Sequence, residues 1–240
     1  MQLAGKTILL TGGTDGIGKE LAHQLRAKGA TVIVTGRNAE RITAAKTDGF
    51  EVIAADLSLP KGIDAVIDGL GSCTPDILIN NAGAGSDHDF REAAPDLADN
   101  DRCIFLNLNA PIHLIARMLP SLRARPEAMI VNVTSGLAIA PRAGGPVYCA
   151  TKAALRSYTQ ALRVQLAGTK VHVLEALPPV VETKLTAGRG NNKMAPAECA
   201  RQIVVAMERN ADEANVGLVK LLQLVHSMSP ALARKIMLRF

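Results

Sequence analysis

Short apolar runs recur along the chain and alternate with stretches whose apolar residues follow a helical spacing. The first run, residues 6–10, fits a buried parallel strand, and residues 17–28 then repeat apolar side chains at Ile17, Leu21 and Leu25. Further strands are predicted at residues 31–35, 51–55, 76–80, 128–134 and 170–176. Strands that alternate with helices predict an α/β fold, built on a Rossmann-type, doubly wound parallel sheet.

The length of 240 residues suits one large α/β domain. No Pro/Gly/Ser-rich linker, repeat or low-complexity tract divides the sequence, so we expect residues 1–240 to form a single domain. Its last part, about residues 218–240, is an apolar segment with a basic end, interrupted by Pro230. Such a segment can pack on a neighbouring subunit, cover a substrate pocket or lie on a membrane surface. Because it is short and broken by proline, we expect packing and no membrane association.

Composition narrows the classes of function. The net charge is +5, but basic residues are spread along the chain and only 2% of residues are aromatic, so we expect no nucleic-acid partner. Four cysteines and five histidines show no metal-like spacing, which predicts no metal site and reduced thiols. No secretory segment and no run of eighteen apolar residues is apparent, so we expect a cytoplasmic protein.

Glycines crowd the connection between the first strand and the first helix, in Thr11-Gly-Gly-Thr-Asp-Gly-Ile-Gly18. Glycine there permits a tight turn and lets a cofactor approach the backbone, while the helix amino terminus offers free N–H groups to a diphosphate. A tight connection without any ligand is the alternative interpretation. The strand before the turn and the helix after it favour dinucleotide binding.

The second predicted strand ends in Gly36-Arg37-Asn38, with no acidic residue. An acid at this place would bind the adenosine ribose diol, whereas an arginine accommodates a 2′-phosphate, for which Gly36 leaves room. Arg37 could also be an ordinary solvated charge. Given the glycine-rich turn upstream, we predict NADP(H) in preference to NAD(H).

Tyr148 and Lys152 lie four residues apart, with Ser135 thirteen residues upstream of the tyrosine. On a helix this spacing places both side chains on one face, about 5–6 Å apart at Cβ. A nearby ammonium favours the phenolate, so the tyrosine could give or take a proton near neutral pH. A serine hydroxyl from a neighbouring strand end could hold a substrate oxygen against that phenol.

Together these motifs resemble the short-chain dehydrogenase/reductase family, from Lys6 to about Thr183. Asp56 is similar to the family's adenine-contacting aspartate, and Asn80-Asn-Ala-Gly83 to the motif that stabilises the sheet and borders the cofactor. The family's catalytic tetrad is matched by Asn107, Ser135, Tyr148 and Lys152.

The resemblance implies an NADP(H)-dependent oxidoreductase that interconverts a carbonyl and an alcohol. Ser135 would hold the substrate oxygen, and Tyr148 would act as general acid in reduction and base in oxidation. Lys152 would hold the nicotinamide ribose, and Asn107 would fix a water that links the lysine to solvent. The implied cofactor contacts are Gly12, Thr14, Asp15, Gly16, Ile17, Gly18, Arg37, Asp56, Leu57, Asn81, Ala82, Gly83, Tyr148, Lys152, Pro178 and Thr183.

The chain departs from the family after the strand at residues 170–176, where Pro178-Pro179 replaces the usual Pro-Gly. Pro179 loses a donor and fixes its φ, so the loop facing the nicotinamide would be stiffer. This loop and the missing Asp-Gly-Gly near the carboxyl end resemble a subgroup related to the oxidoreductase encoded with the D-alanylation genes of Gram-positive cell walls. The altered loop also keeps open an alternative function, a catalytically inactive cofactor-binding sensor or interaction protein.

The substrate, a small carbonyl or alcohol compound, depends on loops at residues 84–100, 136–147 and 180–200, which sequence specifies poorly. Within the last loop, residues 187–195 are rich in Gly and Asn and match the family's mobile substrate loop. The resemblance also implies a homodimer or homotetramer, with contacts near residues 100–118 and 148–166.

Overall fold

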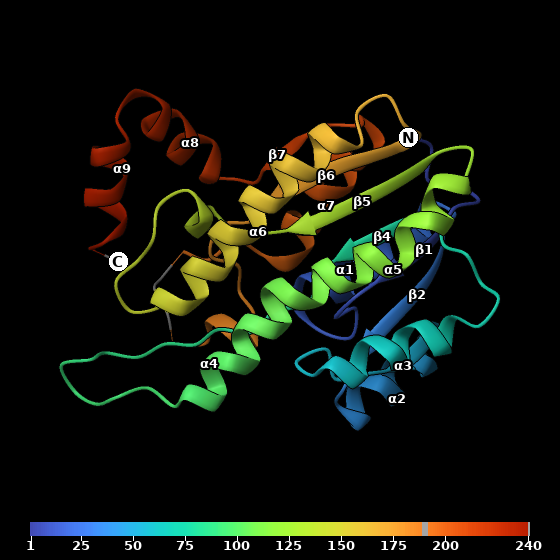
Figure 1. Ribbon diagram of the computed structural model, residues 1–240, viewed down its shortest axis with the longest axis horizontal. Helices are drawn as coiled ribbons and strands as arrows, with labels where there is room; N and C mark the ends of the chain where they lie inside the picture. The colour runs from blue at the N-terminus through green and yellow to red at the C-terminus, as the bar shows by residue number, and fades with distance from the viewer. Residues whose placement is uncertain (189–191, 240) are drawn as a thin grey trace.

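A seven-stranded parallel sheet forms the centre of the molecule, in the order β3-β2-β1-β4-β5-β6-β7 (Figure 1). The computed structural model describes residues 1–188 and 192–239. The strands are β1 Thr7–Leu10, β2 Thr31–Gly36, β3 Glu51–Ala54, β4 Ile77–Asn80, β5 Ala128–Val133, β6 Val171–Leu177 and β7 Glu213–Asn215. Six of them lie at the predicted apolar runs, and the Rossmann-type α/β fold is confirmed. The edge strand β7 has only three residues and no apolar run that would predict it.

Helices connect successive strands and cover both faces of the sheet. Their bounds are α1 Gly16–Ala27, α2 Ala39–Thr47, α3 Pro60–Leu70, α4 Leu97–Ile104, α5 Ala110–Ala124, α6 Pro146–Gln165, α7 Pro196–Glu208, α8 Val219–Met228 and α9 Pro230–Met237. A π-helical turn at Phe105–Asn109 joins α4 to α5, and short 3-10 turns lie at Gly136–Ala138 and Lys184–Thr186.

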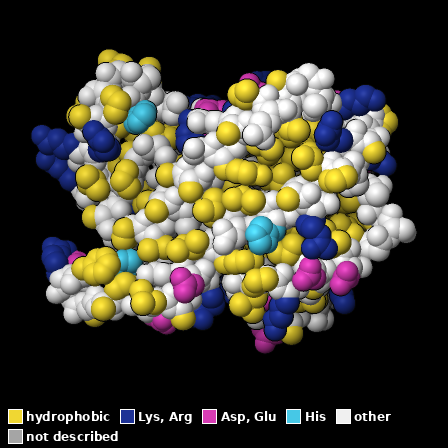
Figure 2. All heavy atoms as spheres, in the orientation of Figure 1, with side chains coloured by type: hydrophobic (Ala, Val, Ile, Leu, Met, Phe, Trp, Pro, Cys, Tyr) yellow, Lys and Arg dark blue, Asp and Glu magenta, His cyan; other side chains and the backbone are white. Residues whose placement is uncertain are grey.

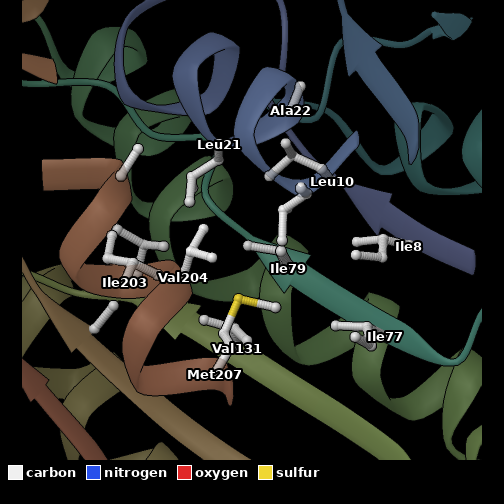
Figure 3. Packing of buried hydrophobic residues seen from close by; sticks show 14 of the residues in the cluster. Ile8, Leu10, Leu21, Ala22, Ile77, Ile79, Val131, Ile203, Val204 and Met207 are labelled. Carbon is white, nitrogen blue, oxygen red and sulfur yellow. The ribbon is translucent and has the colours of Figure 1, made fainter. Parts of the chain in front are cut away.

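The core has two layers because successive side chains of each strand point to opposite faces. Ile8 and Leu10 of β1 pack into the layer beneath α1 and α7, which Figure 3 shows from close by. Leu9, between them, packs into the other layer, beneath α3, α5 and α6. Strands buried on both faces explain why the sequence shows continuous apolar runs in place of alternation.

The strand order reverses beside β1, which pairs with β2 on one side and β4 on the other. In a parallel sheet this arrangement leaves a crevice at the carboxyl ends of the two central strands, where ligands bind. The segments after β1 and β4, residues 11–15 and 81–83, meet there.

The continuous helical stretch Leu97–Ala124 has the length and hydropathy, 1.2, of a membrane span, and 44% of its most apolar window is buried in the protein. Leu114, Ile115 and Met118 lie in the core layer beneath α5. Its apolar character is therefore that of a core helix.

The carboxyl-terminal segment forms two helices, α8 and α9, with Pro230 in the first turn of α9 (Figure 1). Val219 of α8 is buried against the body of the protein, and α9 packs mainly on α8. Most large apolar side chains of the two helices remain exposed, so these side chains do not pack over a pocket of their own chain.

Candidate functional site

The glycine-rich turn after β1 is too tightly packed for side chains at Gly12, Gly13 and Gly18. Gly12 has a φ of +65°, and a Cβ there would lie 2.9 Å from the Cα of Ala82. A Cβ on Gly18 would lie 2.1 Å from the backbone oxygen of Gly12. The turn thereby brings the amino terminus of α1 to the carboxyl edge of the sheet, where free N–H groups and the helix dipole suit an anionic group.

The segment after β4 is hydrogen-bonded to this turn. The Thr11 hydroxyl oxygen accepts from the backbone N–H groups of Asn81 and Ala82, each at 3.0 Å. The Asn81 amide donates to the backbone oxygens of Thr11 at 3.0 Å and of Gly12 at 3.2 Å. Asn81 and Ala82 therefore border the predicted cofactor crevice as the motif implies, and the Asn81 side chain is used to fix the turn.

Asp15 has two structural roles at the start of α1. Its side chain caps the helix by accepting from Gly16 N, and it forms an ion pair with Arg41, in which Nη1 lies 2.8 Å from Oδ2.

A Cβ on Gly36 would lie 2.6 Å from Thr14, so glycine at this position is required by the turn itself. Sequence reasoning missed Arg41, which Asn38 places in the first turn of α2 by capping that helix.

Arg37 lies at the end of β2 and contacts Asp56, with Nη1 3.2 Å from Oδ1. Asp56 also accepts hydrogen bonds from the Ser58 backbone at 3.0 Å and hydroxyl at 2.7 Å. Partial burial opposes ionisation, but the bonds from Ser58 and the charge of Arg37 hold the pKa of Asp56 below its usual value. Leu57, the other predicted contact here, is buried in the core, so only its backbone is free to meet a cofactor.

The loop after β6 reaches back over the turn. A Cβ on Gly16 would lie 3.1 Å from Cγ2 of Thr183, and the Pro178 oxygen accepts from Gly136 N at 2.9 Å. The structure therefore brings both predicted contacts, Pro178 and Thr183, to the site. The predicted substrate loop, residues 187–195, lies partly outside the described residues.

Asn107 is completely buried in the π-helical turn between α4 and α5. Its side chain bonds both backbone groups of Ala84, accepting from the N–H at 3.0 Å and donating to the oxygen at 2.8 Å. A Cβ on Gly83 would lie 3.1 Å from Oδ1 of Asn107 and 3.5 Å from Nζ of Lys152. Asn107, Gly83 and Lys152 thus converge, and π-helical turns of this kind are frequent at functional sites.

Lys152 is buried on α6, 4% exposed, and its Nζ donates to the backbone oxygen of Val133 at 2.9 Å. Burial lowers the pKa of this ammonium from 10.5 to about 8. Nζ lies 5.8 Å from the centre of the Tyr148 ring, one turn earlier on the helix. Ser135, two residues beyond Val133, accepts from Leu137 N at 3.1 Å and caps the 3-10 turn. The four tetrad matches are therefore brought to one edge of the sheet.

A buried ion pair that the sequence did not suggest lies one helical turn beyond Lys152. Arg156 donates to Glu175 of β6 at 2.7 Å and to Glu213 of β7 at 3.0 Å. Glu175 also accepts from the Thr134 hydroxyl at 2.7 Å, and Thr134 directly precedes Ser135. Burial raises the pKa of the Glu175 carboxyl, against the opposing effects of the Thr134 hydrogen bond and the Arg156 charge. The network ties α6 to the end of β5.

Two loops predicted to shape the substrate pocket are joined to each other. Arg142, in the turn before α6, forms an ion pair with Asp87 of the loop after β4. A Cβ on Gly145 would lie within 3.1 Å of both side chains, so the glycine lets this pair pack close to the start of the helix that carries Tyr148. Within residues 1–188 and 192–239, no three His, Cys, Asp or Glu side chains converge as a metal site would require.

The model of the short chain dehydrogenase family matches residues 6–194 of this chain. The chain belongs to the short-chain dehydrogenase family. Membership makes it an oxidoreductase that acts on CH–OH groups.

Curated relatives support the narrower resemblance as well. An uncharacterised oxidoreductase of Bacillus subtilis, DltE, is 42% identical over 77% of this chain and 75% of its own length. A serine 3-dehydrogenase of Rhizobium radiobacter is 34% identical over 79% and 78%. The chain is therefore a DltE-related short-chain dehydrogenase.

Among solved structures, the L-sorbose reductase of Gluconobacter frateurii, complexed with NADPH and L-sorbose, is 27% identical. The match covers 89% of this chain and 95% of that one, with a TM-score of 0.76. A short-chain dehydrogenase of Burkholderia cenocepacia in complex with NADP has a TM-score of 0.88 and covers 99% of both chains, at 24% identity, which shows a shared fold.

Proposed function

We propose that the protein is an NADP(H)-dependent oxidoreductase that interconverts a carbonyl and an alcohol, with Tyr148 as the proton donor and acceptor. The observation that carries the proposal is the buried Lys152, held between Gly83, Asn107 and Val133 at the edge of the sheet where the glycine-rich turn lies. Burying an ammonium costs free energy because the charge loses its hydration. A lysine kept at such a position, on the same helix face as Tyr148 and near the strand end that carries Ser135, supports a catalytic role.

The residues around the turn fit a nicotinamide dinucleotide. The compact backbone at Gly12 and the amino terminus of α1 would hold the diphosphate. Asp56 would contact the adenine, and Lys152 and Tyr148 would hold the nicotinamide ribose. When bound, the cofactor supplies or accepts the hydride.

The preference for NADP(H) is part of the proposal. Arg37 directly follows Gly36 at the end of β2, where the ribose 2′ position of a dinucleotide falls in this fold. Arg41, in the first turn of α2, forms an ion pair with Asp15 of the glycine-rich turn. Two guanidinium groups near this point favour a 2′-phosphate. Related structures with bound NADP and NADPH are consistent with this preference.

The chain's own groups would handle the substrate oxygen and its proton. Ser135 would donate a hydrogen bond to the oxygen, and Tyr148 would protonate it in reduction or deprotonate it in oxidation. With a pKa of about 8, Lys152 remains mostly charged at pH 7, and its charge favours the phenolate. Asn107 would keep the Gly83–Ala84 backbone against the lysine, in addition to any role in holding water.

The substitution Tyr148→Phe tests the proposal, with Tyr158→Phe as a matched control on the same helix. We expect Tyr148→Phe to retain NADPH binding by fluorescence titration and to lose at least about 100-fold in kcat on a panel of aldehydes and ketones. Tyr158→Phe should retain both. Undiminished turnover by Tyr148→Phe would remove the mechanism, and failure of the unsubstituted protein to bind NADPH or NADH would favour a non-enzymatic function.

Homo-oligomerisation through the helices near residues 100–118 and 148–166 is also proposed. Ile104 and Val164 are exposed apolar residues on these helices. Light scattering of the purified protein would test it.

A further inference from the structure

The helices α8 and α9 expose an unusual share of the apolar surface. Together with the adjoining Leu218 and Leu238, they contribute half of the large apolar side chains that the described residues expose. On or next to α8 these are Leu218, Leu221, Leu224 and Met228, and on or next to α9 they are Leu232, Ile236 and Leu238. We call the exposed apolar and basic side chains of residues 218–239 the C-terminal surface. An exposed patch of this kind marks a contact with a partner or a membrane.

The helix pair is held in place by its other side. Val219 and Ala233 are buried, and a Cβ on Gly136 would lie 2.9 Å from Val219 and 3.7 Å from Leu222. α8 therefore packs beside the residue that follows Ser135. The exposed apolar side chains recur at intervals of three and four, which places Leu221, Leu224 and Met228 on one face. This face is exposed and available for binding.

Positive charge accompanies the apolar side chains. From Ala214 to Arg239 the sequence has four basic residues and no Asp or Glu. Arg234 and Lys235 lie in the last turn of α9, and Arg239 follows two residues after the helix ends. Figure 2 shows hydrophobic and basic side chains side by side over this corner of the molecule. Helices with an apolar face flanked by Lys and Arg bind the interface of anionic membranes.

A second copy of the chain is a poorer occupant of the same face. A two-fold dimer brings the same patch of both subunits together, so the basic residues of each would face those of the other. With no acidic residue in 214–239, the segment itself offers nothing to neutralise them, and like charges at an interface cost affinity. Anionic lipid headgroups would neutralise them while Leu221, Met228 and Ile236 enter the acyl boundary.

We propose that α8 and α9 dock the protein on the surface of an anionic lipid bilayer. This differs from the expectation drawn from the sequence, which was that the carboxyl-terminal segment packs against protein and does not bind a membrane. It does not rest on the oxidoreductase proposal. Because α8 contacts Gly136, the docked face would lie close to the catalytic serine, so that the membrane and the site share one side of the molecule.

The test is co-sedimentation of the 240-residue protein with vesicles of phosphatidylglycerol and phosphatidylcholine in equal parts, compared with phosphatidylcholine alone. We expect binding to the anionic vesicles only, weakened by salt. The double variant Lys235→Gln/Arg239→Gln should bind about 30-fold more weakly, from roughly a fivefold loss per charge. Leu221→Gln/Leu224→Gln should lose binding at all salt concentrations.

Matched controls come from exposed residues elsewhere. Arg123→Gln on α5 and Val164→Gln on α6 change similar side chains outside the C-terminal surface and should bind as the parent does. Circular dichroism melting checks that every variant folds. Absence of binding to anionic vesicles at low salt would overturn the proposal. So would a concentration-dependent dimer that Leu221→Gln/Leu224→Gln abolishes, because it would assign the surface to a second copy.

Discussion

The Nζ of Lys152 donates a hydrogen bond to the backbone oxygen of Val133 over 2.9 Å. This contact fixes the middle of α6 to the end of β5, two residues before Ser135 and one helical turn after Tyr148. A buried cation thus joins the helix that carries the tyrosine to the strand that precedes the serine.

The buried lysine should make stability depend on pH in a definite window. Its pKa is about 8 in the folded protein and 10.5 as its ordinary value, so between these pH values the unfolded chain binds more protons. Folding stability contributed by this group therefore rises with pH from 8 to 10.5. Relative to Lys152→Met, the free energy of unfolding of the parent should increase by roughly 2–3 kcal/mol across that window.

Urea unfolding of both proteins at matched pH values measures this difference, and other titrating groups cancel in the comparison. A difference that stays flat from pH 8 to 10.5 would mean that Lys152 titrates normally and is hydrated.

Breaking the Glu175–Arg156 pair should destabilise the protein more than removing both partners together. Glu175→Leu leaves a buried guanidinium with only Glu213 as partner, and we expect a loss of about 3 kcal/mol. The double variant Glu175→Leu/Arg156→Met replaces the pair by apolar side chains and should recover part of it. Chemical denaturation of the two single variants and the double variant provides the cycle.

Thr134→Val is the matched probe of the hydrogen bond alone. It removes the donor to Glu175 without disturbing the ion pair, and about 1 kcal/mol should be lost. If the loss in the double variant equals the sum of the two single losses, the pair contributes no coupling and the network is not what fixes α6 to the sheet.

Arg37→Ala should weaken NADPH binding about 10- to 100-fold, because a hydrogen-bonded charge on the 2′-phosphate is lost. NADH binding should change little, since that cofactor lacks the phosphate. Fluorescence titration of both cofactors measures the effect, and Arg123→Ala, an exposed arginine on α5, serves as control. Equal affinity of the parent for NADPH and NADH, unmoved by the substitution, would make Arg37 a surface charge held by Asp56.

The strands, the glycine-rich turn and the shared helix face of Tyr148 and Lys152 could be predicted because each is encoded in local patterns. Apolar runs specify strands buried on both faces, and the carboxyl ends of parallel strands meet at one edge, so Asn81, Ser135 and the turn after β1 had to be neighbours. The i, i+4 spacing similarly determined that Tyr148 and Lys152 share a face of α6. For these features the order of residues along the chain is sufficient.

Other features were decided only by tertiary structure, because they depend on which side chains meet across elements distant in the sequence. Glu175 looks like an unremarkable polar residue in an apolar strand until Arg156 reaches it from α6. Gly36 must be glycine because a Cβ there would clash with Thr14, and the residues next to Gly36 in the sequence do not indicate this contact. The apolar carboxyl-terminal segment has the composition of a buried one, yet the fold buries Val219 and Ala233 and leaves Leu221, Leu224, Met228 and Ile236 exposed. Local sequence determines periodicity and backbone conformation, whereas burial and ion pairing are set by the packing of the whole chain.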